Sequence, residues 1–185
     1  MSTLGDLLAE HTVLPGNAVD HLHAVVGEWQ LLADLSFADY LMWVRRDDGV
    51  LVCVAQVRPN TAPTVLLADS VGTLAAAEDL PVVTTAFASG AIGSGSDGIL
   101  EHGDDRPGLN VEAVPVRHRG QVVAVLTHQT ALAARRMASP LEGAYLDCAR
   151  DLLHMLSEGT FPNVGDLAMS RSSPRVGDGF IRLDE

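Results

Sequence analysis

The sequence predicts an α+β fold in which a central antiparallel β-sheet is flanked by N- and C-terminal helices. Apolar residues recur every three or four positions between Val19 and Leu35, which is the period of a helix. Short runs rich in valine and leucine follow and are typical of strands. A capping sequence, Ser139-Pro140-Leu141-Glu142, then starts a final helix. At 185 residues the chain can hold one full domain and part of a second.

Two helices are expected before the first strand. Residues 3–10 are predicted to form a short helix, and Pro15-Gly16-Asn17 a turn that leads into a longer one. The longer helix ends near Leu35, and its apolar stripe faces a core or a partner helix. The stripe consists of Leu22, Val25, Val26, Trp29 and Leu32.

The strands are expected to form two antiparallel hairpins. Their sequences are DYLMWVRR, GVLVCVAQVRP, LNVEAVPVRH and GQVVAVLTHQ. Asp47-Asp48-Gly49 connects the first two and His118-Arg119-Gly120 connects the last two, each with a glycine where φ can turn positive. Pro115 cannot donate to a β-ladder, so its strand is expected to be an edge or to carry a bulge there.

The second strand is apolar on both faces. Strict alternation places Leu51, Cys53, Ala55 and Val57 on one face and Val50, Val52, Val54 and Gln56 on the other. A strand with one solvated face would alternate apolar and polar residues, so this strand is expected to be central and covered on both sides. The run from Val122 to Thr127 shows the same pattern.

The middle of the chain gives weaker signals. Residues 72–80 have a helix-forming composition, PVVTTAF after them fits a strand or a helix, and residues 89–108 are typical of a loop. The stretch GSGSDG, residues 93–98, matches the G-x-G-x-x-G pattern of dinucleotide-binding loops. That motif needs a helix directly after it, and breakers interrupt the residues that follow, so a surface loop or a mobile lid over a pocket is favoured.

The final helix is expected to end at Gly159 and to carry two apolar stripes. One stripe is sufficient to pack on a sheet, so the other is available for the helix around Trp29 or for another chain. The first stripe is Leu141, Tyr145, Cys148, Leu152 and Met155, and the second is Leu146, Ala149, Leu153 and Leu156.

The chain is predicted to hold one domain and part of another. Residues 1–160 are predicted to form the first domain. Residues 161–185 are predicted to be a linker and the truncated start of another domain, because GFIRLDE resembles a strand without a partner.

Composition excludes several classes of function. The 24 acidic and 12 basic residues give a net charge of -12, which disfavours binding to nucleic acid. No run approaches the ~20 apolar residues of a membrane span, and the N-terminus lacks the features of a signal peptide. Neither nucleic acid nor a membrane is therefore expected as a partner, and a cytoplasmic location is predicted.

No catalytic or metal-binding motif is present. The histidines lack the H-x-x-x-H and H-E-x-x-H spacings, and the two cysteines lack a C-x-x-C spacing, so neither catalytic residues nor a metal site are expected. Cys53 is the best chemical candidate because it lies in the middle of a strand where a pocket is expected. Most buried cysteines are nevertheless inert, and Cys148 on the final helix is attributed to packing.

Long stretches of the chain resemble one known family. They are MSTLGDLLAEHTVLPG, the run from Ala18 to Gln56, and AMSRSSPRVGDGFIRLD. These are similar to the N-terminal sensor region of soluble actinobacterial sensor histidine kinases of the PdtaS type, and the similarity is weakest from about Pro63 to Asp105. The resemblance implies a GAF domain followed by the start of a PAS domain. It places the kinase module, with its ATP and Mg²⁺, outside this chain, so no cofactor is expected here.

The resemblance also implies a sensory role. A small ligand, for which cyclic nucleotides and cyclic dinucleotides are the class to test, would regulate autophosphorylation and phosphotransfer to an RNA-binding antiterminator response regulator. The candidate ligand-binding residues are Cys53, Arg58, Thr84, Thr85 and His102. Relatives can carry a second cysteine where this chain has Val57, so a mechanism based on a cysteine pair is not expected.

Two further expectations follow from the family. Some GAF proteins reduce free methionine sulfoxide with pocket cysteines, which is the enzymatic alternative for Cys53. That chemistry needs a thiolate and a resolving thiol within reach, whereas Cys148 is expected on the other side of the sheet. Kinases of this family act as dimers, which favours a homodimer that uses the helices around Trp29 and Leu153.

Overall fold

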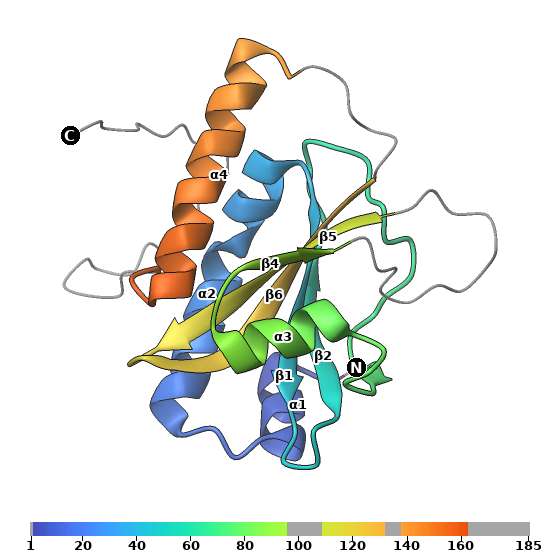
Figure 1. Ribbon diagram of the computed structural model, residues 1–185, viewed down its shortest axis with the longest axis vertical. Coiled ribbons are helices and arrows are strands. Elements are labelled where there is room, and N and C mark those ends of the chain that lie inside the picture. The colour runs from blue at the N-terminus through green and yellow to red at the C-terminus, as the bar shows by residue number, and fades with distance from the viewer. Residues whose placement is uncertain (1, 96–108, 132–137, 163–185) are drawn as a thin grey trace.

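The computed structural model describes residues 2–95, 109–131 and 138–162. Its strands form one six-stranded antiparallel sheet, which confirms the predicted α+β class (Figure 1). The elements are α1 (Leu4–His11), α2 (Gly16–Ser36), β1 (Asp39–Arg45), β2 (Leu51–Val57), β3 (Leu74–Ala75), α3 (Pro81–Ser89), β4 (Gly93–Gly95), β5 (Leu109–His118), β6 (Gln121–Ala131) and α4 (Pro140–Glu158).

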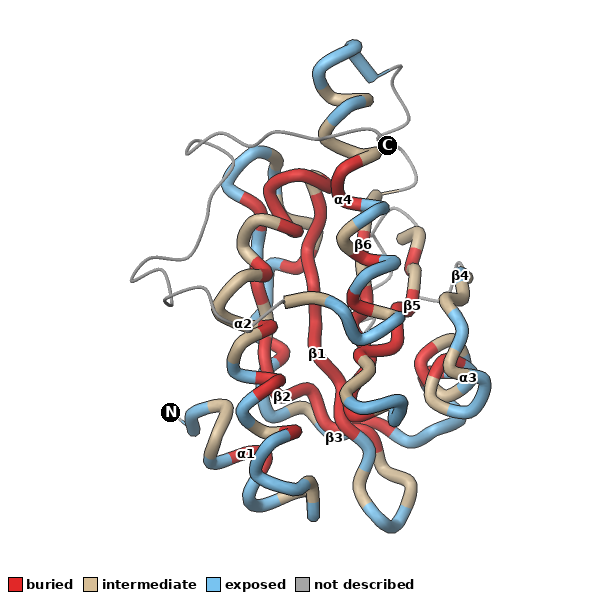
Figure 2. Tube along the Cα trace, turned by 90° about the vertical axis from the view of Figure 1, so that its left-hand side faces the viewer, coloured by how far each residue is buried: buried red, intermediate tan, exposed pale blue. Residues whose placement is uncertain are grey.

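The sheet has the strand order β3-β2-β1-β6-β5-β4. Both predicted hairpins are present, and β1 pairs with β6 to join them. Strands β1 and β6 are therefore central, as the buried trace of β1 in Figure 2 shows. Strand β2 lies one place from the edge, beside the two-residue strand β3, so its predicted central position is only partly correct.

The two faces of the sheet carry separate cores. Side chains of α1, α2 and the C-terminal half of α4 pack on one face, together with Met42, Val114 and Leu126 from the strands. Helix α3 and Leu66 cover the other face, over Trp43 and Cys53. Two-sided burial explains why the strand sequences are apolar at nearly every position.

Three of the helices lie where the sequence predicts them. Capping boxes start α1 at Thr3 and α4 at Ser139, each satisfying backbone N–H groups that a helix start leaves unpaired. Helix α2 starts earlier than predicted, because Gly16 and Asn17 already belong to its first turn after Pro15.

The prediction of a helix over residues 72–80 is wrong. Leu74 and Ala75 pair with β2 as strand β3, and the helix begins only at Pro81. Proline suits the first turn of a helix, and a left-handed Gly90 ends this one, so both boundaries have a local cause. The alanines of residues 75–77 favour a helix weakly, and pairing with β2 outweighs that preference.

A β-bulge overturns the predicted face assignment of β2. Met42 pairs with Ala55 and Trp43 pairs with Cys53, so Val54 is an extra residue between the two pairs. Beyond the bulge the alternation is reversed. Leu51 and Cys53 therefore face α3, whereas Val52, Val54, Ala55 and Val57 all face the helices on the opposite side.

Part of the predicted loop over residues 89–108 forms a strand instead. Gly93 to Gly95, the first half of GSGSDG, forms strand β4 and pairs with residues 111–113 of β5. The rest of that motif, residues 96–98, lies outside the described residues.

Pro115 lies beyond the residues of β5 that pair with β4, and a register irregularity follows it between Val116 and Arg117. The proline therefore needs no N–H for a second neighbour, as predicted.

The second stripe of α4 packs within this chain. Leu153 and Leu156 belong to the same core cluster as Trp29, and Ala149 packs with Leu35 of α2. Trp29 and Leu153 are each 5% exposed, so they are unavailable for the predicted dimer contact. The predicted strand at 179–185 lies outside the described residues, and the domain boundary at 160 stays a prediction.

Candidate functional site

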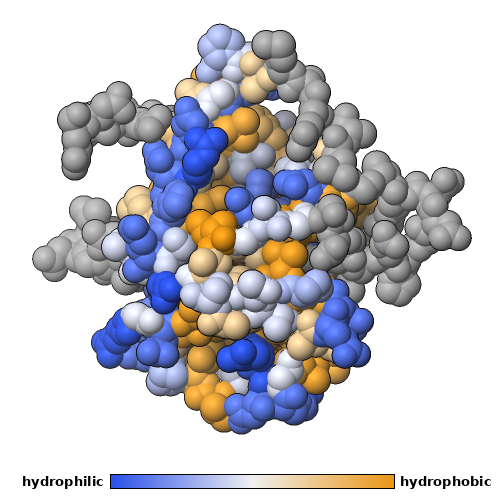
Figure 3. Space-filling view, viewed as in Figure 1, coloured by the Kyte–Doolittle hydropathy of each residue, from blue (hydrophilic) through white to orange (hydrophobic). Residues whose placement is uncertain are grey.

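The sheet face beneath α3 is the candidate binding face. Its apolar floor is built from alternate residues of the central strands, since positions 41 and 43 of β1 and position 125 of β6 point the same way. Helix α3 contributes Val83 and Ala86 from above. Figure 3 shows this side of the molecule, where hydrophobic patches lie between hydrophilic ones.

Two buried polar side chains interrupt this floor. Thr127 and Gln129 lie two positions apart on β6, and neither side chain has any exposed surface. The Thr127 hydroxyl accepts a hydrogen bond from Trp43 Nε1 at 3.2 Å. Gln129 Nε2 donates to the same hydroxyl at 3.3 Å.

The Gln129 amide is left with an unpaired group. Its Oε1 is buried and has no partner among the described residues. If the amide is turned by 180°, Oε1 accepts the Thr127 O–H and Nε2 becomes the unpaired group instead. Either orientation leaves one hydrogen-bonding atom of a fully buried amide unsatisfied, which is costly and uncommon in folded proteins.

A third polar residue lies beside this pair. Asp39 of β1 is directly opposite Gln129 in the β1–β6 ladder and is 1% exposed. Its carboxylate accepts hydrogen bonds from the Thr64 hydroxyl and, at 2.7 Å, from the backbone N–H of Val65. Asp39 therefore holds residues 64–66 over the sheet, and Leu66 closes the apolar floor at that end.

The residues predicted from the sequence do not include these polar side chains, although β6 carries a signal for them. Val125, Thr127 and Gln129 occupy alternate positions on one face of β6, and only the last two are polar. A change from apolar to polar along one face of a central strand indicates a site or a buried network.

Cys53 lies on this face, and its environment suppresses thiolate formation. Burial raises the pKa of the thiol to about 12, and the weak contact with the Ala55 carbonyl at 3.5 Å offsets this only in part. Cys148 packs against Leu35 between α2 and α4, on the opposite side of the sheet. These are the only cysteines of the chain, so no second thiol lies near Cys53.

The other candidate residues do not converge with Cys53. Arg58 donates to the carbonyl oxygens of Leu66 and Ala68, at 3.0 and 2.8 Å, and so holds the loop above the sheet. Thr84 donates to the Ala77 carbonyl at 2.8 Å, and Thr85 is exposed on the outer side of α3. His102 lies outside the described residues. A ligand role for these residues stays a prediction.

A separate pocket of about 170 Å³ contains none of the predicted residues. Arg45 lies over the Phe87 ring there, 5.3 Å from its centroid. No unpartnered buried polar atom among the described residues belongs to this pocket, so nothing in it selects a ligand. It is lined by Thr12, Val13, Leu14, Val44, Arg45, Asp47, Phe87, Val122 and Val123.

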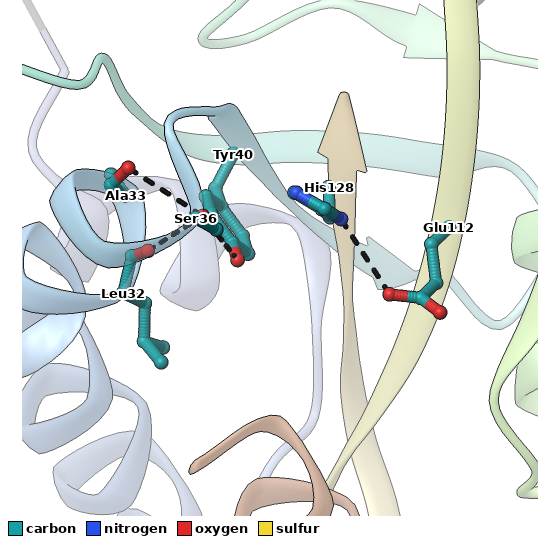
Figure 4. Close-up of polar contacts among 6 residues, drawn as sticks. All are labelled: Leu32, Ala33, Ser36, Tyr40, Glu112 and His128. Atoms are coloured by element: carbon teal, nitrogen blue, oxygen red, sulfur yellow. Dashed lines mark hydrogen bonds and ion pairs between the residues drawn. The ribbon is translucent and has the colours of Figure 1, made fainter. Parts of the chain in front are cut away.

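A second polar cluster lies on the helical face of the sheet (Figure 4). The Tyr40 and Ser36 hydroxyls are 3.0 Å apart, and Ser36 also donates to the Leu32 carbonyl. The His128 ring stacks on Tyr40 with centroids 5.2 Å apart, and its Nδ1 lies 3.5 Å from a Glu112 carboxylate oxygen. That distance is long for a hydrogen bond, so the contact is a weak one.

This cluster has unequal effects on its ionisable members. Contact with His128 lowers the pKa of the Glu112 carboxyl, and Arg150 and His154 on α4 lower it further, while burial acts in the opposite direction. Burial raises the pKa of Tyr40, so its hydroxyl stays protonated at neutral pH. The cluster joins α2 to strands β1, β6 and β5.

The six-stranded antiparallel sheet, with helices on one face and a covered, partly polar floor on the other, is the α+β fold of GAF-type sensory domains. Residues 4–149 match the family described as "Histidine kinase PdtaS, GAF domain". The chain belongs to this family.

Similar proteins support the same assignment. The sensor histidine kinase PdtaS of Mycolicibacterium smegmatis is 84% identical over 185 residues, which are all of this chain and 37% of that protein. PdtaS of Mycobacterium tuberculosis strain H37Rv is 69% identical over the same span. A solved structure described as the sensor region of a sensor histidine kinase matches 99% of this chain and 62% of its own, with 66% identity and a TM-score of 0.82. This chain thus corresponds to about a third of such a kinase.

Two observations concern the described residues alone. No group of three or more histidine, cysteine, aspartate or glutamate side chains is placed there to hold a metal ion. No helix in that part of the chain is long and apolar enough to cross a membrane.

Proposed function

We propose that this domain binds a small polar molecule on the sheet face beneath α3, and that binding regulates a histidine kinase of which the domain is the sensor. The observation that carries the proposal is the unpaired amide group of Gln129 in a covered and largely apolar floor. A buried polar group without a partner is retained at a cost of about 1–3 kcal/mol, and a ligand that supplies the partner recovers it. Apolar walls with a few fixed polar groups are typical of small-molecule sites.

Nucleotides are the ligand class that we propose to test first. A glutamine amide pairs well with the edge of a purine base, because both offer a donor beside an acceptor. The Trp43 ring lies on the same face and adds aromatic surface. Cyclic nucleotides and cyclic dinucleotides carry the base edge that such an amide would pair with.

The remaining steps of the proposal concern the whole protein. Ligand binding would change autophosphorylation and phosphotransfer to a response regulator that binds RNA, in a cytoplasmic, dimeric kinase. The relatives named PdtaS support the kinase part of this scheme. Because Trp29 and Leu153 are buried in the core, a dimer contact would use other surfaces of the helices.

The experiment compares two matched glutamine variants of β6. Gln129→Leu removes the buried amide, whereas Gln121→Leu makes the same change at an exposed position of the same strand. Thermal unfolding is followed with a panel of cyclic mono- and dinucleotides. A ligand at 100 times its dissociation constant stabilises the wild type by about 2.7 kcal/mol. We expect Gln129→Leu to lose this stabilisation and Gln121→Leu to keep it.

The unliganded variants provide a second readout. Removal of an unsatisfied amide should leave the free energy of unfolding unchanged or raise it by about 1 kcal/mol. A loss of more than about 2 kcal/mol in Gln129→Leu would mean that the amide is a structural group, and the proposal would lose its support. Ligand stabilisation that survives Gln129→Leu would place the binding site elsewhere.

The methionine sulfoxide reductase alternative is disfavoured by the cysteine geometry. Its thiolate would have to form on Cys53, whose pKa is raised to about 12, and its resolving thiol would have to be Cys148 on the other face of the sheet. Reduction of free methionine sulfoxide with thioredoxin should therefore not exceed the rate of a Cys53→Ser variant.

A further inference from the structure

Arg117 lies near the end of β5, where both α3 and α4 also end. The register of the β5–β6 ladder shifts between Val116, which pairs with Ala124, and Arg117, which pairs with Val122, so Val123 of β6 is an extra residue beside Arg117. In Figure 1 the C-terminal ends of α3 and α4 approach the same end of the β5–β6 hairpin. Helix α3 covers the candidate binding face, whereas α4 lies on the other face.

The Arg117 side chain is fixed to the end of α3. Its Nη2 donates to the Gly90 carbonyl at 2.7 Å, and its Nη1 donates to the Gly120 carbonyl at 3.3 Å. Gly90 is the left-handed residue that ends α3, with φ of 65°. A β-carbon at Gly90 would overlap Nη2 and lie 3.1 Å from Cζ, so only glycine fits while the guanidinium stays in place.

The Arg117 backbone is in contact with the end of α4. Gly159 ends that helix with φ of 80°, and its N–H donates to the Leu156 and Met155 carbonyls. A β-carbon at Gly159 would lie 3.0 Å from the Arg117 carbonyl oxygen and 3.3 Å from the Arg117 β-carbon. The end of α4 is therefore packed directly on the backbone of the same residue.

We propose that Arg117 couples the C-terminal end of α3 to the C-terminal end of α4 across the sheet. The side chain binds one helix end and the main chain contacts the other, and at both ends a β-carbon added to the glycine would press against Arg117. A shift of the Gly90 carbonyl moves the guanidinium, and the irregular pairing at Val116 and Arg117 lets the backbone follow. The contact of that backbone with Gly159 then changes.

The sensory meaning of this coupling rests on the proposed function. A ligand beneath α3 would act on Gly90, and α4 is the helix from which the chain continues toward residue 185. The coupling itself is a property of the unliganded protein. It can therefore be measured without a ligand, and its failure is distinguishable from a failure of ligand binding.

Hydrogen exchange of the full chain, read by peptide mass spectrometry, tests the coupling with two glycine variants. Gly90→Ala places a β-carbon against Arg117. Gly72→Ala imposes a similar backbone strain, with φ of 85°, but a β-carbon there has nothing within 4 Å. We expect Gly90→Ala to accelerate exchange about tenfold both at the end of α3 and over residues 155–160. Gly72→Ala should accelerate exchange only near its own position.

A double variant separates coupling from general destabilisation. In an Arg117→Met background the side chain no longer joins Gly90, so adding Gly90→Ala should leave exchange at residues 155–160 unchanged. Unchanged exchange at 155–160 in Gly90→Ala itself would overturn the proposal. So would an acceleration of equal size in peptides of β1 and β2, because that pattern reports global unfolding. If Gly90→Ala does not fold, Arg117→Met alone must accelerate exchange at both helix ends and spare the β1–β2 hairpin.

Discussion

The reactivity of Cys53 is the most direct measure of how the candidate binding face is closed. None of its surface is exposed, and burial raises the pKa of the thiol from 9.0 to about 12. At pH 8 a thiol of pKa 9 is about one-tenth thiolate, whereas a pKa of 12 leaves about one part in ten thousand. Since the thiolate is the reactive form, Cys53 should react about a thousandfold more slowly than an exposed thiol.

The assay measures maleimide labelling by peptide mass spectrometry, so that Cys53 and Cys148 are followed separately. An Ala144→Cys variant supplies an exposed thiol on α4 of the same molecule as the reference. Labelling in denaturant gives the rate for the same peptides without structure. We expect maleimide to label Cys53 slowly in the native protein at pH 8 and rapidly only in denaturant.

The raised pKa of Cys53 also determines how the stability of the native fold depends on pH. Because the folded-state pKa is raised, the neutral thiol is favoured by the native fold, and its stabilisation is complete below pH 9. That stabilisation is lost as the pH rises from 9 toward 12. Native labelling of Cys53 within tenfold of the Ala144→Cys reference would refute the reasoning, and would revive the cysteine-based enzymatic alternative.

Further predictions concern the helical side of the sheet and the end of the chain. Leu153→Ala should reduce the free energy of unfolding by about 2–5 kcal/mol in urea titrations without changing the sedimentation coefficient. Dissociation of a dimer by this variant would place Leu153 at an interface after all. Glu112→Gln should reduce the free energy of unfolding near pH 7, because the folded state lowers the pKa of this carboxyl and so favours its charged form. The difference from wild type should vanish as the pH falls from 4.5 through the lowered folded-state pKa. A difference that persists in acid would contradict a lowered pKa for Glu112. A chain shortened to residue 160 should keep its unfolding midpoint, and limited proteolysis of the full chain should leave a core of that size. Equal resistance of residues 161–185 would contradict the predicted domain boundary.

Local features of the sequence determined most of the elements of this protein. The capping box at Ser139, the apolar stripe of α2 and the two hairpins each depend on residues close together in the chain, so their physical causes can be recognised without a structure. The resemblance of the chain ends to PdtaS-type kinases gave the GAF fold, and the family match confirms it.

The features that shape the site were decided by contacts between distant residues. The bulge at Val54 reverses the facing of β2, and it depends on pairing with Met42 and Trp43 across the hairpin. The sequence left open whether Leu153 faces a dimer partner or the core, and the packing of α4 with α2 places it in the core. The hydrogen bonding of the Gln129 amide involves Trp43, which is 86 positions away in the sequence. Both side chains donate to the same Thr127 hydroxyl. Periodicity along the chain reports which residues are apolar, but only the folded chain fixes which of their neighbours satisfy a polar group, because hydrogen bonds are short-ranged in space and not in sequence.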